Sequence, residues 1–407
     1  MNIIFIEPSF PSNQREFARA LHAAGANVYG IGERPAEYLD HEMKHWLTDY
    51  YQVKSVVHEP SLLKAVKAIQ SVCWVDRLEA TVEAHIMAAA KVREATGIPG
   101  TSVHTAWLCR DKPAMKEALR KAGIPCAQST RASTPQEARD FAERVGYPLI
   151  IKPPDGAGAA ATYRVNSAEE LEHVIVASHL ADGVAVAVEE FIEGHEGYLD
   201  TLTINGDVVH EFVTHYYPNV LEAMRERWIS PQMVTTNRLQ EPGYREVRQM
   251  ARKVNEILGI GTSATHMEWF VGPKGLKFSE IGCRPPGVGQ WDVYNAANEF
   301  DLYFEWACAL THGKAHKAPS RRYSAGMIAL RPECDGHITG YSGVDAIGKR
   351  YGGDIVAAHM PEPGSPTQPV EAGYMANAWM RVRHPDYDVL RSILDDIGQT
   401  VTVHAAG

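Results

Sequence analysis

The sequence predicts an α/β unit at the amino terminus, followed by mixed α+β units. A βαβ pattern opens the chain, with a strand at 2–6, a helix at 14–24 and a second strand at 27–31. Further on, a β-branched strand ends at Lys152, before a loop of glycine and alanine. The segment 265–281 has the pattern of an antiparallel hairpin. A parallel unit therefore precedes antiparallel ones.

Composition limits the classes of function. The chain has 407 residues and is 45% apolar, enough for roughly two to four domains. Lys plus Arg is 40 against 50 for Asp plus Glu, a net charge of −10, which argues against nucleic-acid or anionic membrane partners and favours small molecules. Six scattered cysteines without metal-site spacing suit a reducing compartment. The apolar run at the start is too short for a signal peptide or membrane span, so we expect a cytoplasmic protein.

The first unit lacks the usual phosphate-binding glycines. Its first turn, at 7–13, has neither G-x-G-x-x-G nor a Walker A lysine, so dinucleotide binding is not expected. A further strand at 71–75 and a helix at 78–96 complete the unit. We place a domain boundary near residue 105.

Two lysines follow at structurally marked positions. In the motif R-D-K-P at 110–113, Asp111 is a good helix cap, and capping explains most of the motif, which leaves Lys112 ambiguous. Lys152 ends a buried strand where the chain turns on two prolines. Such a lysine either points into a cleft as a charge for phosphate or lies on the surface. The small-residue loop at 155–162 is either a phosphate-binding lid or an ordinary flexible loop.

An acidic and apolar segment comes next. A buried strand at 185–188 runs into E-E-F-I-E-G-H-E at 189–196. Such a segment is a natural hinge, whose backbone can pair with a purine edge while Phe191 and Ile192 cover the face of the base. A plain edge strand is the alternative.

The predicted hairpin brings two carboxylates together. Its turn, at 273–275, has proline first and glycine last, which fits a three-residue loop with Gly272 facing Leu276. Counting back places Glu268 opposite Glu280, with Cβ atoms roughly 5 Å apart. The pair suits a hard divalent cation with phosphates nearby, or a solvated acidic pair at a sheet edge.

These motifs stand in one order: R-D-K-P, I-K-P-P with its loop, E-E-F-I-E-G-x-E, then E-W-F and S-E-I-G-x-R. This order resembles the ATP-grasp superfamily over roughly residues 1 to 315. The resemblance implies a doubly wound pre-ATP-grasp domain at 1–105, a lid subdomain with the phosphate loop at 106–195, a catalytic subdomain with the metal site at 196–320, and a small α+β region at 321–407.

The resemblance also implies an ATP site. The first lysine would lie toward the α-phosphate, the second toward the α-phosphate and adenine. Backbone groups of Glu190 and Ile192 would read the purine, and Glu196 would bind the ribose hydroxyls. The ATP-binding residues implied in this way are Lys112, Lys152, Gly156, Ala157, Gly158, Glu189, Glu190, Phe191, Ile192 and Glu196.

The metal and catalytic residues follow from the same resemblance. Glu268 and Glu280 match ligands of one or two Mg²⁺ ions, with Mn²⁺ as an alternative ion. Many members carry Asn two residues after the second Glu, where this chain has Gly282, so the number of ions stays open. Arg284 matches the arginine that steadies the transferred phosphoryl group. His266 shares a strand face with Glu268, and is either a catalytic group toward the acyl group or amine, or a structural histidine.

We therefore expect an ATP-dependent ligase that activates a small carboxylic acid as an acyl phosphate and couples it to an amine. Lys152, Arg284 and magnesium would neutralise the charge that develops during phosphoryl transfer. Alternatives are a carboxylase or formyl-phosphate type of enzyme and a non-catalytic ATP-binding regulator. The intact arginine argues against the regulator, because binding alone does not require it.

The sequence indicates the substrate-binding residues less clearly than the ATP site. The segment 210–236 offers Arg225 and Arg227, which either hold a substrate carboxylate or lie on a solvated helix face. Arg331, at a strand end, either faces the site or, as we expect, forms a salt bridge. The region after 320 is predicted to hold strands at 325–330, 355–359 and 374–383 and a final helix at 387–397. The expected partners are a small acid and an amine, with homodimer formation left open.

Overall fold

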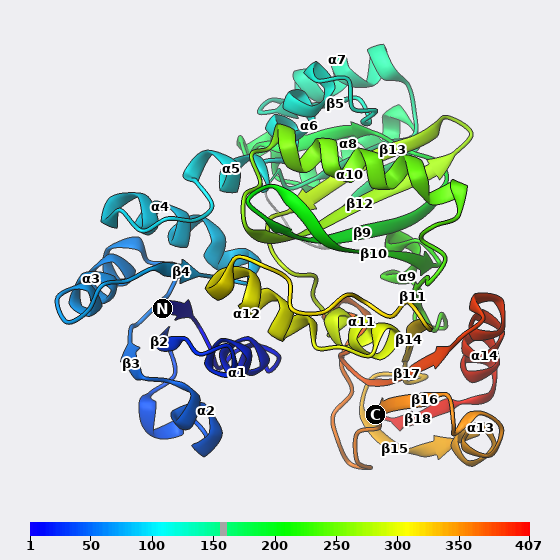
Figure 1. Ribbon diagram of the computed structural model, residues 1–407. Helices are drawn as coiled ribbons and strands as arrows, with labels where there is room; N and C mark the ends of the chain where they lie inside the picture. Colours follow the sequence, from blue (N-terminus) through cyan, green and yellow to red (C-terminus); the bar gives the residue numbers. More distant parts are fainter. Residues whose placement is uncertain (155–160) are drawn as a thin grey trace.

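The computed structural model describes residues 1–154 and 161–407 (Figure 1). Gly156, Ala157 and Gly158 of the expected phosphate loop lie outside the described residues. Within those residues the chain forms four sheets, ordered β3-β2-β1-β4, β5-β8-β6-β7, β13-β12-β9-β10-β11-β14-β17-β16 and β15-β18. No helix in the described ranges is both long and apolar enough to cross a membrane.

The amino-terminal unit is a parallel sheet with helices, as predicted. Strand β1 pairs in parallel with β2 and β4, and β2 pairs in parallel with β3. The elements are β1 (Asn2–Ile6), α1 (Gln14–Ala23), β2 (Asn27–Gly32), α2 (His41–Trp46), β3 (Asp49–Gln52), α3 (Glu59–Gln70), β4 (Arg77–Glu79), α4 (Ile86–Thr96) and α5 (Val103–Leu108).

One strand and one helix start differ from the prediction. The segment 71–75 is not a strand, because Val72 and Trp74 are 69% and 77% exposed and the sheet is completed by β4 instead. The helix expected from residue 78 begins only at Ile86, after a 3₁₀ turn over Glu83–His85. Thr81, which follows β4, and Glu83, in this turn, thereby contact distant parts of the chain.

The second sheet is antiparallel. The cap of α6 forms as predicted, since the Asp111 carboxylate accepts a hydrogen bond from the Ala114 N–H at 3.0 Å. Helices α7 and α8 cover one face of the sheet through an apolar core that contains Phe141, Leu171 and Ile175. The elements are α6 (Lys112–Lys121), β5 (Ser129–Ala132), α7 (Pro135–Val145), β6 (Leu149–Lys152), β7 (Tyr163–Val165), α8 (Ala168–Ala177) and β8 (Val186–Glu190).

The eight-stranded sheet is also antiparallel and joins strands from both sides of residue 320. Its strands are β9 (His195–Ile204), β10 (Asp207–Tyr217), β11 (Gln232–Thr235), β12 (Ser263–Gly272), β13 (Gly275–Gly282), β14 (Ser324–Leu330), β16 (Ile355–His359) and β17 (Ala378–His384). The helices are α9 (Val220–Ala223), α10 (Arg245–Ile257), α11 (Gln290–Asn298), α12 (Leu302–His312), α13 (Val344–Tyr351) and α14 (Tyr387–Thr400), and β15 (His337–Ser342) pairs with β18 (Thr402–Ala406).

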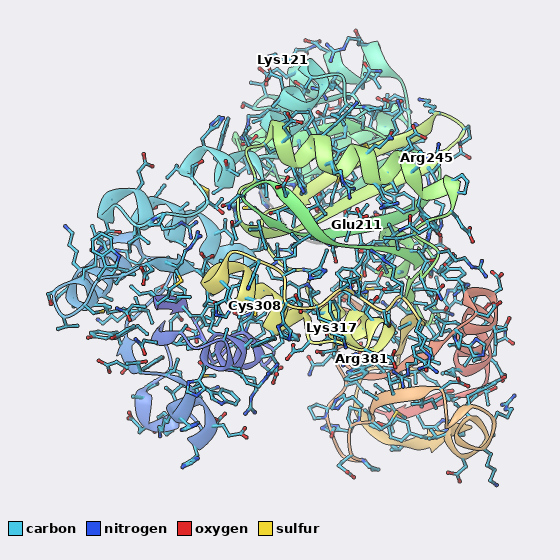
Figure 2. The ribbon with its side chains drawn as sticks, in the orientation of Figure 1. Lys121, Glu211, Arg245, Cys308, Lys317 and Arg381 are labelled. Carbon is cyan, nitrogen blue, oxygen red and sulfur yellow. The ribbon has the colours of Figure 1, made fainter. Side chains whose placement is uncertain are left out.

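Helices cover both faces of this sheet. On one face, α10 packs through Val247 and Val254. Glu211 of β10, labelled in Figure 2, accepts hydrogen bonds of 2.8 Å each from Arg248 and Arg252 of α10. On the other face lie α11 and α12, drawn in yellow between the amino-terminal unit and the carboxyl-terminal elements (Figure 1). The predicted strand at 374–383 starts at Ala378, because the residues before it are held in a loop by hydrogen bonds between Asn377 and the Gln368 backbone.

An aromatic cluster docks the amino-terminal unit onto these helices. The ring of Phe17, on α1, lies 5.0 Å from Trp291, 4.9 Å from Tyr303 and 5.1 Å from Trp306, measured between ring centroids. Phe17 is buried, so the four rings form a continuous core between the first unit and the eight-stranded sheet. This contact fixes where the loops of the first unit lie relative to the sheet.

We predict that Phe17→Ala lowers the free energy of unfolding by about 3–5 kcal/mol, because it removes a buried ring and leaves a cavity. Chemical denaturation monitored by tryptophan fluorescence measures the change. The matched control is Phe10→Ala, whose ring is 69% exposed and whose loss should stay within about 0.5 kcal/mol. Equal losses in the two variants would contradict the docking role of Phe17.

Candidate active site

The hairpin places Glu268 directly opposite Glu280, as predicted. The predicted turn is wrong, however. Gly272 pairs with Gly275, which shifts the pairs near the turn by one residue relative to the expected register. A bulge that leaves Ser279 unpaired shifts the register back, so the two glutamates face each other after all.

Ammonium groups surround this pair. The Nζ atoms of Lys112 and Lys152 lie 3.5 and 3.7 Å from Glu280 Oε2. Lys152 also lies 3.1 Å from Glu189 Oε2, and Lys116 lies 2.6 Å from the same atom. Four elements, α6, β6, β8 and β13, therefore direct alternating charges into one buried cluster.

Burial and ion pairing oppose each other in this cluster. Burial alone would raise the pKa of Glu189, but Lys116 and Lys152 outweigh it and lower that pKa to about 2. Burial would lower the pKa of Lys152, but Glu189 and Glu280 outweigh burial and raise it. Lys116 was missed in the sequence, although its place one helical turn after Lys112 puts both on one helix face.

The expected adenine hinge follows β8. The Glu190 N–H donates to the Gln128 carbonyl at 2.9 Å, and its carboxylate is ion-paired with Lys274 of the hairpin turn. The Phe191 ring is stacked against the Arg164 guanidinium at 4.2 Å. The Ile192 N–H makes no hydrogen bond within the described parts of the chain.

Glu196, on β9, adds a third carboxyl group. It is buried, and its Oε2 accepts a hydrogen bond from the Val220 N–H at 2.7 Å. Burial and the neighbouring Glu268 carboxylate raise its pKa to about 8. Without a cation, the site therefore keeps this third carboxyl group largely protonated at neutral pH.

His266 connects the hairpin to the neighbouring strand. Its Nδ1 lies 2.6 Å from Asp200 Oδ1 and its Nε2 lies 3.6 Å from Glu268 Oε1. The other Asp200 oxygen accepts a hydrogen bond from the Tyr294 hydroxyl. Burial would lower the pKa of His266, but Asp200 and Glu268 raise it to about 9, so the ring is an imidazolium at neutral pH and holds Glu268 in place.

Arg284 follows β13 at the edge of this cluster. Its Nε donates to Glu83 Oε2 at 2.7 Å and its Nη1 donates to the Pro285 carbonyl at 2.8 Å. Burial would lower the pKa of Arg284, but Glu83 outweighs burial and raises it. The sequence analysis missed Glu83 because that residue was expected inside a regular helix.

The arginines considered for substrate binding differ in their partners. Arg227 forms an ion pair with Asp335 at 2.5 Å, and Arg225 donates to the Thr162 carbonyl at 3.2 Å. The salt bridge expected for Arg331 is wrong, because its Nη1 donates instead to carbonyls of the 223–229 segment. Its Nη2 is buried without a hydrogen-bond partner in the described structure.

Tyr374 presents a second unused donor. Its hydroxyl is buried without a hydrogen-bond partner among the described residues. Its ring is stacked on Tyr216 with centroids 6.4 Å apart, and the Tyr216 hydroxyl lies 3.5 Å from Glu268 Oε1. Burial and Glu196 raise the pKa of Tyr374, so its hydroxyl is protonated at neutral pH.

A cation at this site would need ligands beyond the protein. Within the ranges that the structure describes, no group of three or more His, Cys, Asp or Glu side chains is arranged to hold a metal. Glu268 and Glu280 supply two facing carboxylates, and Mg²⁺ usually takes one or two protein carboxylates together with phosphate oxygens. The residues present therefore fit an ion that is shared with a polyphosphate.

Comparison with known proteins agrees with this geometry. Residues 117–300 match the family model described as ATP-grasp domain. The chain is 26% identical over 251 residues to the L-arginine-specific L-amino acid ligase of Bacillus subtilis, and the match spans 60% of each chain. Only three-fifths of that relative's length is thus matched.

Solved structures confirm the predicted fold class. The L-amino acid ligase from Bacillus licheniformis superposes with a TM-score of 0.78 at 16% identity, covering 100% of this chain and 99% of that one. The N5-carboxyaminoimidazole ribonucleotide synthetase from Thermotoga maritima superposes with a TM-score of 0.70 at 17% identity, with the same coverage. At such low sequence identities, the structural likeness shows the fold alone and not the activity.

We predict that in metal-free protein Asp200→Asn shifts the pKa of His266 from about 9 toward its ordinary value of 6.5. Because the folded-state pKa is raised, the interaction stabilises the protein fully below pH 6.5 and is lost as pH rises through about 9. The variant should lose about 3 kcal/mol more at low pH than at high pH. Urea unfolding near each limit and NMR titration of the imidazole test this, and equal losses at both limits would contradict it.

Proposed function

We propose that this chain, whose residues 117–300 form an ATP-grasp domain, is an ATP-dependent carboxylate–amine ligase that releases ADP and phosphate. The observation that carries the proposal is the facing pair Glu268 and Glu280, with two lysine ammonium groups within 3.7 Å of Glu280. Facing carboxylates with lysine ammonium groups beside them suit a metal–polyphosphate ligand, which supplies charges of both signs in complementary places.

In this proposal Glu268 and Glu280 hold Mg²⁺, and Lys112 and Lys152 bind phosphate oxygens. When bound, the ion would supply positive charge that offsets repulsion between an attacking carboxylate and the transferred phosphoryl group. Arg284 would hold the same phosphoryl group by a planar, two-pronged contact. His266, as an imidazolium 3.6 Å from Glu268, would orient a metal ligand rather than accept a proton.

The hinge residues would bind the nucleoside. The Ile192 N–H is available to a purine nitrogen, while Glu196 lies beside Glu268 where a ribose could reach it. Glu189 would act indirectly, since its side chain is occupied by Lys116 and Lys152. We retain Gly156, Ala157 and Gly158 as the proposed phosphate loop.

We further propose that both substrates are amino acids or molecules of similar size, as the name of the Bacillus subtilis relative suggests. The substrate's anionic group would bind to the unpaired Nη2 of Arg331 and the unpaired hydroxyl of Tyr374. Buried donors without partners are costly to the free protein, and an anion would satisfy both. The acid would become an acyl phosphate, which the amine then attacks with release of phosphate.

The test is phosphate release from Mg-ATP across a panel of single acids and acid–amine pairs, with mass spectrometry of the products. Release that requires both an acid and an amine, with a condensed product, supports the ligase. Release with bicarbonate or formate in place of the acid would favour a carboxylase or formyl-phosphate enzyme. ATP binding without release across the panel would favour a regulator.

We predict that Glu280→Gln reduces turnover by about 100-fold or more, because it removes a charge from the proposed metal site. The phosphate-release assay measures the loss at saturating ATP and magnesium. Glu117→Gln is the matched control, since that glutamate is on the surface of α6 and is ion-paired with Lys121. Normal turnover in Glu280→Gln would rule out the metal assignment.

We predict that Tyr374→Phe raises the KM of one substrate roughly 2- to 10-fold, the value of one lost hydrogen bond, without changing the KM for ATP. Because the hydroxyl has no hydrogen-bond partner among the described residues, the melting temperature should stay constant or rise. In the control Tyr351→Phe, which loses a hydrogen bond to Asp396 far from the site, kinetics should be unchanged. An unchanged KM in Tyr374→Phe would remove this residue from the substrate site.

A further inference from the structure

The carboxylate of Glu83 lies between two arginines from different parts of the chain. Its Oε2 accepts from Arg284 Nε at 2.7 Å, and its Oε1 lies 3.3 Å from Arg110 Nη1. Arg110 Nη1 also donates to the Glu83 backbone carbonyl at 2.5 Å. Glu83 opens the 3₁₀ turn after β4, so the contact joins the amino-terminal unit to the end of the catalytic hairpin.

This contact lies where a side chain at residue 282 would crowd it. A Cβ atom added to Gly282 would lie 3.3 Å from Glu83 Oε2 and 3.5 Å from Arg284 Cγ. The backbone of Gly282 is not in the left-handed region, so its conformation alone does not require glycine. What glycine provides here is room for the Glu83 carboxylate, at the position where the family resemblance implies an asparagine in many relatives.

The contact also restricts the guanidinium. Nε is held by Glu83 and Nη1 by the Pro285 carbonyl, which fixes both the plane and the direction of the group. Nη2 makes no hydrogen bond within the described ranges, so it remains available to an anion. A planar guanidinium that is already fixed along one edge can bind an anion along its other edge without a further loss of conformational freedom.

We propose that Glu83 is a positioning residue that orients Arg284 from the amino-terminal unit, and that Gly282 provides the space for it. The proposal rests on the proposed function, because Arg284 is taken to act on the transferred phosphoryl group. It makes the docked position of the amino-terminal unit a condition for forming the acyl phosphate. Relatives with a side chain at the position of Gly282 would have to orient their arginine in another way.

The first test is Glu83→Gln, which keeps the shape of the side chain and removes its charge. We expect kcat to fall roughly 10- to 100-fold, the usual effect of losing a group that orients a catalytic residue, with an unchanged KM for ATP. The control is Glu172→Gln, which breaks a Glu–Arg pair with Arg139 on the surface of the second sheet and should leave kcat unchanged.

Trapping the acyl phosphate distinguishes an effect of Glu83 on activation of the acid from an effect on the attack by the amine. Hydroxylamine intercepts an acyl phosphate as a hydroxamate, so the rate of hydroxamate formation reports activation of the acid alone. If Glu83 positions Arg284, Glu83→Gln lowers hydroxamate formation and full ligation by the same factor. If hydroxamate formation is normal and only ligation falls, Glu83 acts on the amine and the proposal is overturned.

The space at Gly282 gives a second test. Gly282→Ala should lower kcat in the native background but have no further effect when combined with Glu83→Ala, because the displaced carboxylate is then absent. Independent losses that multiply in the double variant would overturn the proposal.

A third measurement does not depend on activity. The losses in melting temperature for Glu83→Gln and Arg284→Gln should not add, because both variants break the same contact. If the wild-type protein released no phosphate with any substrate, the proposed function would fail, while additive melting losses would overturn the Glu83–Arg284 contact itself.

Discussion

The structure of the candidate site depends on the repulsion between Glu268 and Glu280 and on the charges that compensate it. Two carboxylates that face each other on one side of a sheet are unfavourable unless positive charge lies nearby. Here Lys112 and Lys152 approach Glu280, while His266 approaches Glu268. His266 belongs to the hairpin itself, whereas Lys112 and Lys152 come from α6 and β6, so the charge balance of the hairpin requires α6 and the second sheet to be assembled against it.

Local patterns in the sequence were sufficient to predict the helix and the strands that carry these charged residues. Asp111 caps α6 as expected, and Lys152 ends a buried strand because its apolar run stops there. The pairing of Glu268 with Glu280 was also predicted, although two errors cancelled in reaching it. The turn is tighter than expected, and a bulge at Ser279, which no turn rule indicates, returns the strands to the expected register.

The groups that the sequence did not reveal are those brought in over long distances. Glu83 contacts Arg284 from the amino-terminal unit, which is docked by contacts such as that between Arg19 of α1 and Asp301, 282 positions apart. Asp200 stands in a strand of apolar character, and only the pairing of β9 with β12 places it beside His266. Arg331 was expected to form a salt bridge, but its partners are backbone carbonyls of a segment about a hundred residues earlier. No local periodicity contains this information.

The charge arrangement also explains how a site with so many buried ions can exist before its ligand binds. Lys152 is shared between Glu189 and Glu280, and Glu196 remains largely protonated, so no carboxylate is left without a positive charge or a proton. A metal–polyphosphate ligand would exchange these contacts rather than add to them, since the cation takes the carboxylates while the phosphates take the ammonium groups. The ion pair between Glu189 and Lys116 joins β8 to α6 and does not involve Lys152, so it would remain if Lys152 bound a phosphate instead. In the proposed complex, the charges of the ligand would therefore replace contacts between charges that the free protein already holds in the site.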